Sequence, residues 1–130
     1  VIGVSFLLSK VLLVIQVFLL LIFLRLMLSV RDFSETLVWM KKCNTSFCLS
    51  DNLMRNKKAI EFSSKLVPNC TCLIQAIAFK VMRSSDPEIM LVIGISKTDQ
   101  FESHAWICKN EKIILGGEDS ATKFTKLVAF

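Results

Sequence analysis

The fold is decided by residues 72–80, CLIQAIAFK, together with residues 102–107, ESHAWI. The first stretch is almost entirely apolar and predicts a helix that begins at Cys72 and lies at the centre of the core. The second stretch predicts a strand that carries His104. A thiol at a helix start and an imidazole on a later strand are the two groups that a cysteine nucleophile needs. His104 is the only histidine of the chain, so there is no other imidazole to act as the base.

The expected position of Cys72 favours nucleophilic chemistry. The positive end of the helix dipole and the free N–H groups of the first turn stabilise a thiolate, and the same N–H groups can hold an oxyanion. The imidazole of His104 can take the thiol proton and return it to a leaving amine. A carboxylate or an amide on the following strand would orient that imidazole. The opposing interpretation is that Cys72 is a small core residue and that His104 caps an edge strand.

Length and composition limit the class of protein. The chain has 130 residues, which fits one domain with an appended segment, and its hydrophobic fraction of 53% is concentrated in the first thirty residues. The net charge of +5 suits an acidic peptide partner or an anionic membrane surface. Nucleic acid is not expected as a partner, because no basic run is interleaved with aromatic residues and tyrosine is absent.

The five cysteines are interpreted as reduced thiols in a cytoplasmic protein. Their number is odd, and no cleavable signal pattern precedes them. Cys70 and Cys72 are separated by one residue, and the chain has one histidine. A structural zinc site prefers a gap of about two to four residues and a second pair of ligands, so the match is poor. No metal is therefore predicted.

The chain divides into three segments. Residues 1–30 form an apolar helix, in which residues 4–29 either cross a membrane or lie buried against the domain or a partner protein. Residues 31–48 form a helix, with Ser34 as its expected N-cap, and a linker. Residues 49–130 form the main domain, whose first helix is expected to be capped by Ser50 or Asp51 and to end before Pro68.

The main domain continues with the central helix, for which Asn69 or Thr71 is the expected cap. Strands are predicted at 89–95, 101–108 and 112–115, and the apolar residues 124–130 are expected to pair or pack. The order of helices, central helix and antiparallel strands predicts an α+β fold.

Four blocks in order resemble a known family. They are residues 72–78 (CLIQAIA), 91–95 (LVIGI), 104–107 (HAWI) and 113–117 (IILGG). Together they are similar to the leader peptidase, or B protein, of lasso peptide biosynthesis, which belongs to the transglutaminase-like cysteine proteases. The resemblance covers about residues 50–130, and the helical N-terminal part is similar to the front half of that family. It implies a transglutaminase-like or papain-like core, in which a helix bearing the cysteine packs on a small antiparallel sheet.

The resemblance implies a peptidase that removes the leader from a ribosomally made precursor peptide, with Cys72 as the nucleophile and His104 as the general base and acid. The third member in the family is an aspartate after the next strand. Here that region reads LGGED, so Asp119 is the preferred third member, and Glu118 or another group is the alternative. Family activity is described as ATP-linked. No cofactor is assigned here, because Gly116-Gly117 lacks the Lys and Ser/Thr of a phosphate-binding loop.

The resemblance also implies partners: a precursor peptide, a separate leader-recognition protein and a macrolactam cyclase. Two other functions stay open. The same thioester chemistry would serve an acyl transferase of the transglutaminase type. A degenerate domain with an apolar anchor would bind peptide or serve as a scaffold at a membrane.

Three further residues have alternative interpretations. Trp106 shares a strand face with His104 and either walls the site or packs in the core. Gln75 lies one turn after Cys72 and either contacts substrate or satisfies a buried backbone group. Cys70 is a bystander thiol or a resolving thiol.

Overall fold

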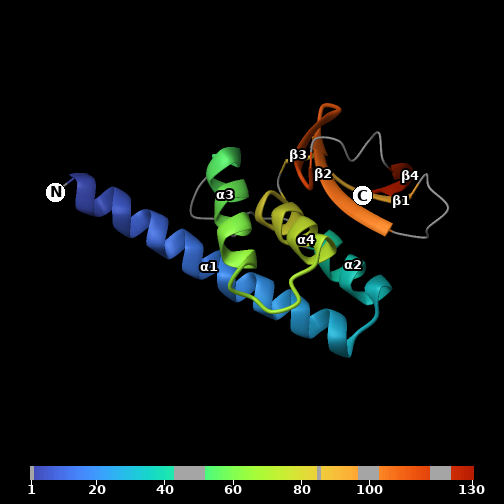
Figure 1. Ribbon diagram of the computed structural model, residues 1–130, viewed down its shortest axis with the longest axis horizontal. Coiled ribbons are helices and arrows are strands. Elements are labelled where there is room, and N and C mark those ends of the chain that lie inside the picture. Colours follow the sequence, from blue (N-terminus) through green and yellow to red (C-terminus); the bar gives the residue numbers. More distant parts are fainter. Residues whose placement is uncertain (1, 43–51, 85, 97–102, 118–123) are drawn as a thin grey trace.

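The computed structural model describes residues 2–42, 52–84, 86–96, 103–117 and 124–130. Within these residues the chain has four helices followed by four strands (Figure 1). The helices are α1 (Ile2–Val30), α2 (Phe33–Lys42), α3 (Leu53–Ser64) and α4 (Cys72–Met82). The strands are β1 (Ile89–Ser96), β2 (Ser103–Lys109), β3 (Lys112–Leu115) and β4 (Phe124–Ala129). The predicted α+β class is confirmed.

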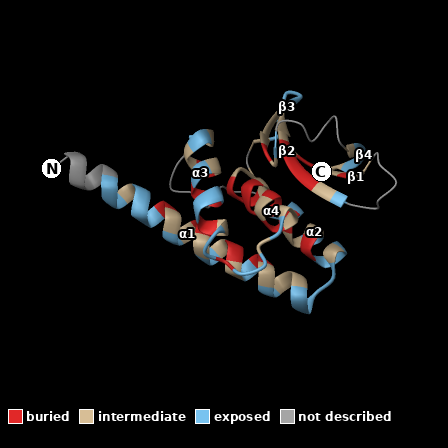
Figure 2. Cartoon of the chain, in the orientation of Figure 1, coloured by how far each residue is buried: buried red, intermediate tan, exposed pale blue. Residues whose placement is uncertain are grey.

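The strands form one antiparallel sheet in the order β3-β2-β1-β4. Helix α4 lies between this sheet and the long helix α1, and α3 lies beside α4 on α1 (Figure 1). The expected central position of α4 is confirmed: Ile77, Phe79 and Val81 are fully buried. Figure 2 shows the buried residues concentrated on α4, the inner strands and the part of α1 that α4 covers.

Polar side chains fix where the helices begin. Thr71 caps α4, since its Oγ1 accepts a hydrogen bond from the Ile74 N–H at 3.3 Å, so one of the two expected caps is confirmed. Asn52 caps α3 with its side-chain oxygen. The predicted caps, Ser50 and Asp51, lie outside the described residues. The expectation that Ser34 caps α2 is wrong, because Asp32 Oδ1 accepts from the Glu35 N–H at 2.9 Å.

The two faces of the sheet have different neighbours. Ala105 and Ile107 on β2 belong to the core that contains α4. Trp106 alternates with them and points to the other face, where it covers Gly94 of β1. A Cβ at Gly94 would lie 2.8 Å from the Trp106 ring and 2.8 Å from the Thr125 carbonyl oxygen. Trp106 is 3% exposed, so it is buried without being part of the α4 core.

Helix α1 has one buried and one exposed side. Its buried residues pack into the core with α3 and α4 and are Leu13, Val17, Leu21 and Leu24. Its exposed side is also apolar and includes Leu8, Leu12, Ile15, Leu19, Phe23, Leu26 and Val30. By length and composition, Leu7–Val30 is able to cross a membrane. The protein thus has a long apolar N-terminal helix, one side of which closes the core.

Candidate active site

Cys72 is the first residue of α4, so its side chain lies at the N-terminal end of that helix. The Oγ1 of Thr71 accepts a hydrogen bond from the N–H of Ile74, and the carbonyl oxygen of Thr71 accepts one from the N–H of Gln75 at 3.1 Å. The N–H groups of Cys72 and Leu73 make no hydrogen bond to any described residue. These two donors are therefore available to a negatively charged oxygen formed next to the Cys72 thiol.

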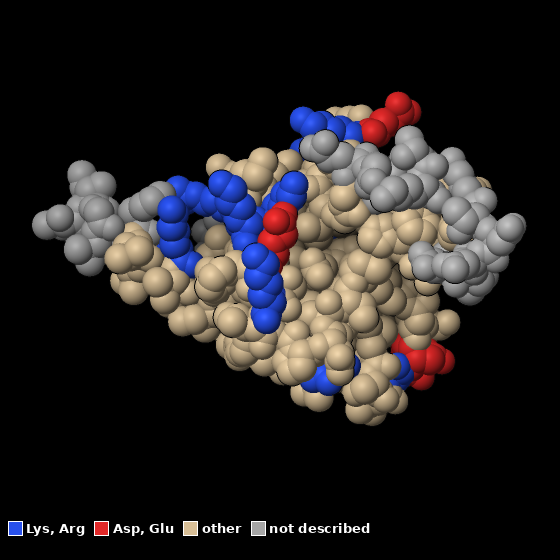
Figure 3. Space-filling model, viewed as in Figure 1, with Lys and Arg blue, Asp and Glu red and all other residues tan. Residues whose placement is uncertain are grey.

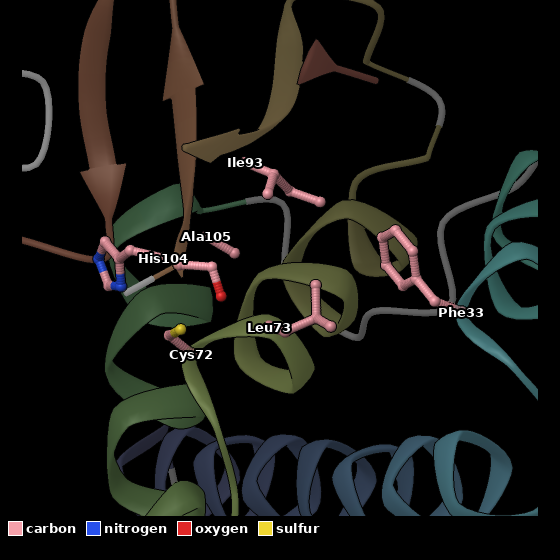
Figure 4. Close-up of a pocket in the computed structure, with 7 residues that line it drawn as sticks. Phe33, Cys72, Leu73, Ile93, His104 and Ala105 are labelled. Atoms are coloured by element: carbon pink, nitrogen blue, oxygen red, sulfur yellow. The ribbon is translucent and has the colours of Figure 1, made fainter. Parts of the chain in front are cut away.

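A cavity of about 170 Å³ lies where α4, α2, β1 and β2 meet (Figure 4). Its lining consists of Phe33, Cys72, Leu73, Ile93, Ser103, His104 and Ala105. Most of its wall is apolar, and Cys72 and His104 supply the thiol and the imidazole among its lining residues. The residues predicted as nucleophile and base, Cys72 and His104, therefore both border this cavity.

The imidazole of His104 is held by its neighbours on the face of the sheet turned away from α4. Its Nε2 lies 2.7 Å from the carbonyl oxygen of Gly116. Its ring lies near Trp106, with ring centroids 5.9 Å apart, and near Phe124, with ring centroids 5.0 Å apart. Because a carbonyl oxygen only accepts hydrogen bonds, Nε2 carries the proton when this hydrogen bond forms.

No hydrogen bond joins the thiol of Cys72 to the imidazole of His104 among the contacts of the described residues. In Figure 4 one ring nitrogen lies on the side of the imidazole nearer to Cys72. Catalytic hydrogen bonds are often long in a free enzyme and shorten when substrate binds. Asp119 and Glu118, the candidate third members, lie outside the described residues.

The sequence did not reveal the part played by Gly116. In the sequence, Gly116-Gly117 stands out only as part of the IILGG block and as an incomplete phosphate-binding loop, yet Gly116 has φ +107° and its carbonyl contacts His104. A Cβ at Gly116 would lie 2.6 Å from the Trp106 Cβ. A glycine pair after a strand is a signal of close backbone approach, but which group the backbone approaches depends on the fold.

The other cysteines of the described residues differ from Cys72 in their surroundings. Burial raises the pKa of the Cys70 thiol above its usual value, and Arg25 offsets part of that effect. Cys108 lies on β2 and lines a groove on the face of the sheet that carries Trp106. Within the described ranges, no three His, Cys, Asp or Glu side chains gather closely enough to hold a metal ion.

The family model of the transglutaminase-like superfamily matches residues 18–129, and the chain therefore belongs to that superfamily. Enzymes of this superfamily are generally cysteine proteases and acyltransferases. No curated protein and no solved structure matches the chain. The match begins inside α1, whose second half packs on α4.

Proposed function

We propose that this protein is a cysteine peptidase that removes the leader from a ribosomally made precursor peptide. The observation that carries the proposal is that Cys72, at the start of the central helix, and His104, the only histidine, line one cavity. Membership of the transglutaminase-like superfamily supports thiol-based chemistry. The four sequence blocks that resemble lasso leader peptidases support the choice of substrate.

The first half of the reaction forms a thioester. His104 accepts the proton of the Cys72 thiol, and the thiolate sulfur bonds to the carbonyl carbon of the scissile amide. The carbonyl oxygen becomes negative and is stabilised by the N–H groups of Cys72 and Leu73. The carbon–nitrogen bond then breaks, and the amine leaves with the proton that the imidazolium returns.

The second half releases the leader. Water gives a proton to His104 and attacks the thioester carbon, and the Cys72 sulfur leaves and regains a proton. The products are a leader with a free carboxylate and a core peptide with a free amine. If an amine attacked in place of water, the same steps would give acyl transfer, which is the acyltransferase alternative.

The size of the cavity supports separate recognition of the leader. A volume of about 170 Å³ is below the range of sites that enclose a drug-sized ligand, so it fits little more than the scissile group and a small side chain. Affinity for the leader must then come from elsewhere, and we propose a separate leader-recognition protein. A macrolactam cyclase would use the freed amine.

A basic groove supports an acidic peptide partner. Lysine and arginine side chains gather over α1 and α3 on the face shown in Figure 3. A groove of about 420 Å³ between these helices is lined by Lys10, Arg55 and Lys58 beside Phe62. Such a surface attracts an acidic segment that also has apolar side chains. The apolar exposed side of α1 supports association with a membrane from the cytoplasmic side.

A second candidate function is a peptide-binding scaffold without catalysis. It is favoured by one observation: the His104 ring is held by Gly116, Trp106 and Phe124, and no hydrogen bond joins it to the Cys72 thiol among the described contacts. A cavity that binds peptide without a thiol–imidazole pair would hold its ligand unchanged.

Cleavage of the precursor separates the two candidates. The full chain is mixed with the precursor peptide encoded beside it and with its recognition protein, and the products are identified by mass spectrometry. Wild type is expected to release the leader, Cys72→Ala and His104→Ala are expected to be inactive, and Cys70→Ala is the matched control that stays active. Cleavage that survives in Cys72→Ala would contradict the proposal, and binding without cleavage in wild type would support the scaffold.

A further inference from the structure

The imidazole of His104 is fixed by the main chain at the end of β3. Its Nε2 donates to the Gly116 carbonyl oxygen at 2.7 Å, a short distance for a hydrogen bond from nitrogen to oxygen. Trp106 and Phe124 lie against the ring and limit its rotation. Nδ1 makes no hydrogen bond to a described residue and is thus the ring nitrogen left to exchange protons.

Gly116 reaches this position because it has no side chain. Its φ of +107° is a conformation that other residues rarely adopt. A Cβ would also come within 3.1 Å of three atoms of β2: the Trp106 Cβ, the Trp106 Cα and the Ala105 carbonyl oxygen. Glycine therefore lets the chain leave β3 close to β2, so that its carbonyl lies beside the imidazole.

We propose that the Gly116 carbonyl is the group that orients His104, in the place where the resemblance leads one to expect an aspartate. Gly116 is then a positioning residue, which keeps the proton on Nε2 and the lone pair of Nδ1 on the side that accepts the thiol proton. The inference rests on the proposed function, because orienting the imidazole matters only if His104 exchanges protons.

A carbonyl and a carboxylate would differ in what they do to the imidazolium that forms during the reaction. Both accept a hydrogen bond from the Nε2 N–H, but only the carboxylate adds a full negative charge beside the cation. Orientation by Gly116 thus predicts that neutralising Asp119 or Glu118 leaves the tautomer of His104 unchanged. Orientation by an acid predicts the opposite.

The test is nitrogen-15 NMR of the histidine ring in the full chain, which needs no assignment because the chain has one histidine. Wild type is expected to show a protonated Nε2 whose N–H exchanges slowly with water, and an unprotonated Nδ1. Asp119→Asn and Glu118→Gln are expected to keep both features. A protonated Nδ1 in wild type, or loss of the slow N–H in either acid variant, would overturn the inference.

The variant Gly116→Ala gives a second test of the inference. It is expected to lose the slowly exchanging N–H and to populate both tautomers, and to lower kcat for precursor cleavage by about tenfold or more. A Gly116→Ala protein that is folded and keeps the slow N–H would overturn the inference. If Gly116→Ala does not fold, wild type and the two acid variants still decide.

The two proposals fail in different ways. The NMR features are measured without substrate, so they test the orientation of His104 whether or not the protein cleaves a peptide. If Cys72→Ala still cleaves the precursor, or if wild type does not cleave it, the peptidase proposal is rejected. The NMR result is unaffected in either case. A third outcome is that wild type cleaves normally and that Asp119→Asn loses both cleavage and the slowly exchanging N–H. This outcome would reject the role of Gly116 and keep the peptidase.

Discussion

The side-chain oxygen of Thr71 lies 3.3 Å from the backbone nitrogen of Ile74, and this hydrogen bond fixes the start of the helix that begins with Cys72. The cap satisfies one N–H of the first turn and leaves those of Cys72 and Leu73 to the cavity. It therefore links the stability of α4 to the geometry around the candidate nucleophile.

Thr71→Ala is expected to lower the free energy of unfolding by about 1 kcal/mol, the usual cost of a lost N-cap. Precursor cleavage is expected to fall as well, because the first turn then frays and moves the Cys72 thiol. Urea unfolding and cleavage rates measure the two effects. Thr71→Ser keeps the hydroxyl and is the control, so a similar loss in both variants would contradict a role for the cap.

Selective alkylation distinguishes the two neighbouring cysteines. Burial raises the pKa of the Cys70 thiol, so at neutral pH its reactive thiolate is scarce. We expect a small alkylating reagent to modify Cys72 before Cys70, as read from peptide masses after brief exposure. Urea-unfolded protein is the control, in which the two should react at similar rates. Faster modification of Cys70 in the folded protein would contradict this order.

Stability at acid pH depends on the ion pair that joins the segment between α4 and β1 to the end of β2. Lys109 Nζ lies 2.9 Å from Asp86 Oδ2, and this hydrogen bond holds the pKa of the Asp86 carboxyl below its usual value of 3.8. Since the folded pKa is depressed, the pair stabilises the fold above pH 3.8, and the contribution is lost as the pH falls through the folded value.

Lys109→Met is accordingly expected to cost up to about 1 kcal/mol at pH 6 and close to nothing near pH 2. The measurement is urea unfolding at both pH values. Lys112→Met, which removes an exposed lysine from β3, is the matched control and should show no such dependence. An equal cost of Lys109→Met at both pH values would argue against the pair.

Charge reversal tests the basic groove between α1 and α3. Lys58→Glu places an acid among Lys10 and Arg55 and is expected to weaken binding of an acidic precursor segment, with the larger loss at low salt. Binding is measured by fluorescence anisotropy of a labelled precursor at two salt concentrations. Lys112→Glu changes the net charge equally away from the groove, so an equal loss in both variants would show that only net charge matters.

Much of the fold follows from residue order. The apolar run of α4 and the strand bounds 112–115 are predicted correctly, because each depends on local periodicity. The cap of α2 is not predicted correctly, because Asp32 and Ser34 are both good capping residues and the structure uses Asp32. β2 covers Ser103–Lys109, and the first two residues of the predicted strand, 101 and 102, lie outside the described residues.

Residues of the candidate site can be predicted from the sequence only where the type of side chain indicates its role. Cys72 and His104 stand out by type and position, and the period of two correctly puts Trp106 on the face of His104. Which face of the sheet meets α4 depends on tertiary packing, which no local pattern specifies. The Gly116 carbonyl had no side-chain signature at all, because every residue has a carbonyl.

The exposed side of α1 is expected to bind a membrane surface. Replacing Ile15 and Leu19 together with glutamate should abolish co-sedimentation with vesicles that contain phosphatidylglycerol, because charged groups enter an apolar phase at high cost. Leu66→Glu, an exposed site on another segment, is the control and should still bind. Unchanged binding of the double variant, with its circular dichroism intact, would contradict the expectation.

The two sides of α1 also limit how the protein can be shortened. Deleting the apolar helix to improve behaviour in water would remove Leu13, Val17, Leu21 and Leu24, and the side of α4 that they cover would face solvent. The remaining domain would then expose apolar surface that α1 now covers. Substitutions on the outward side of the helix are the route to a soluble preparation.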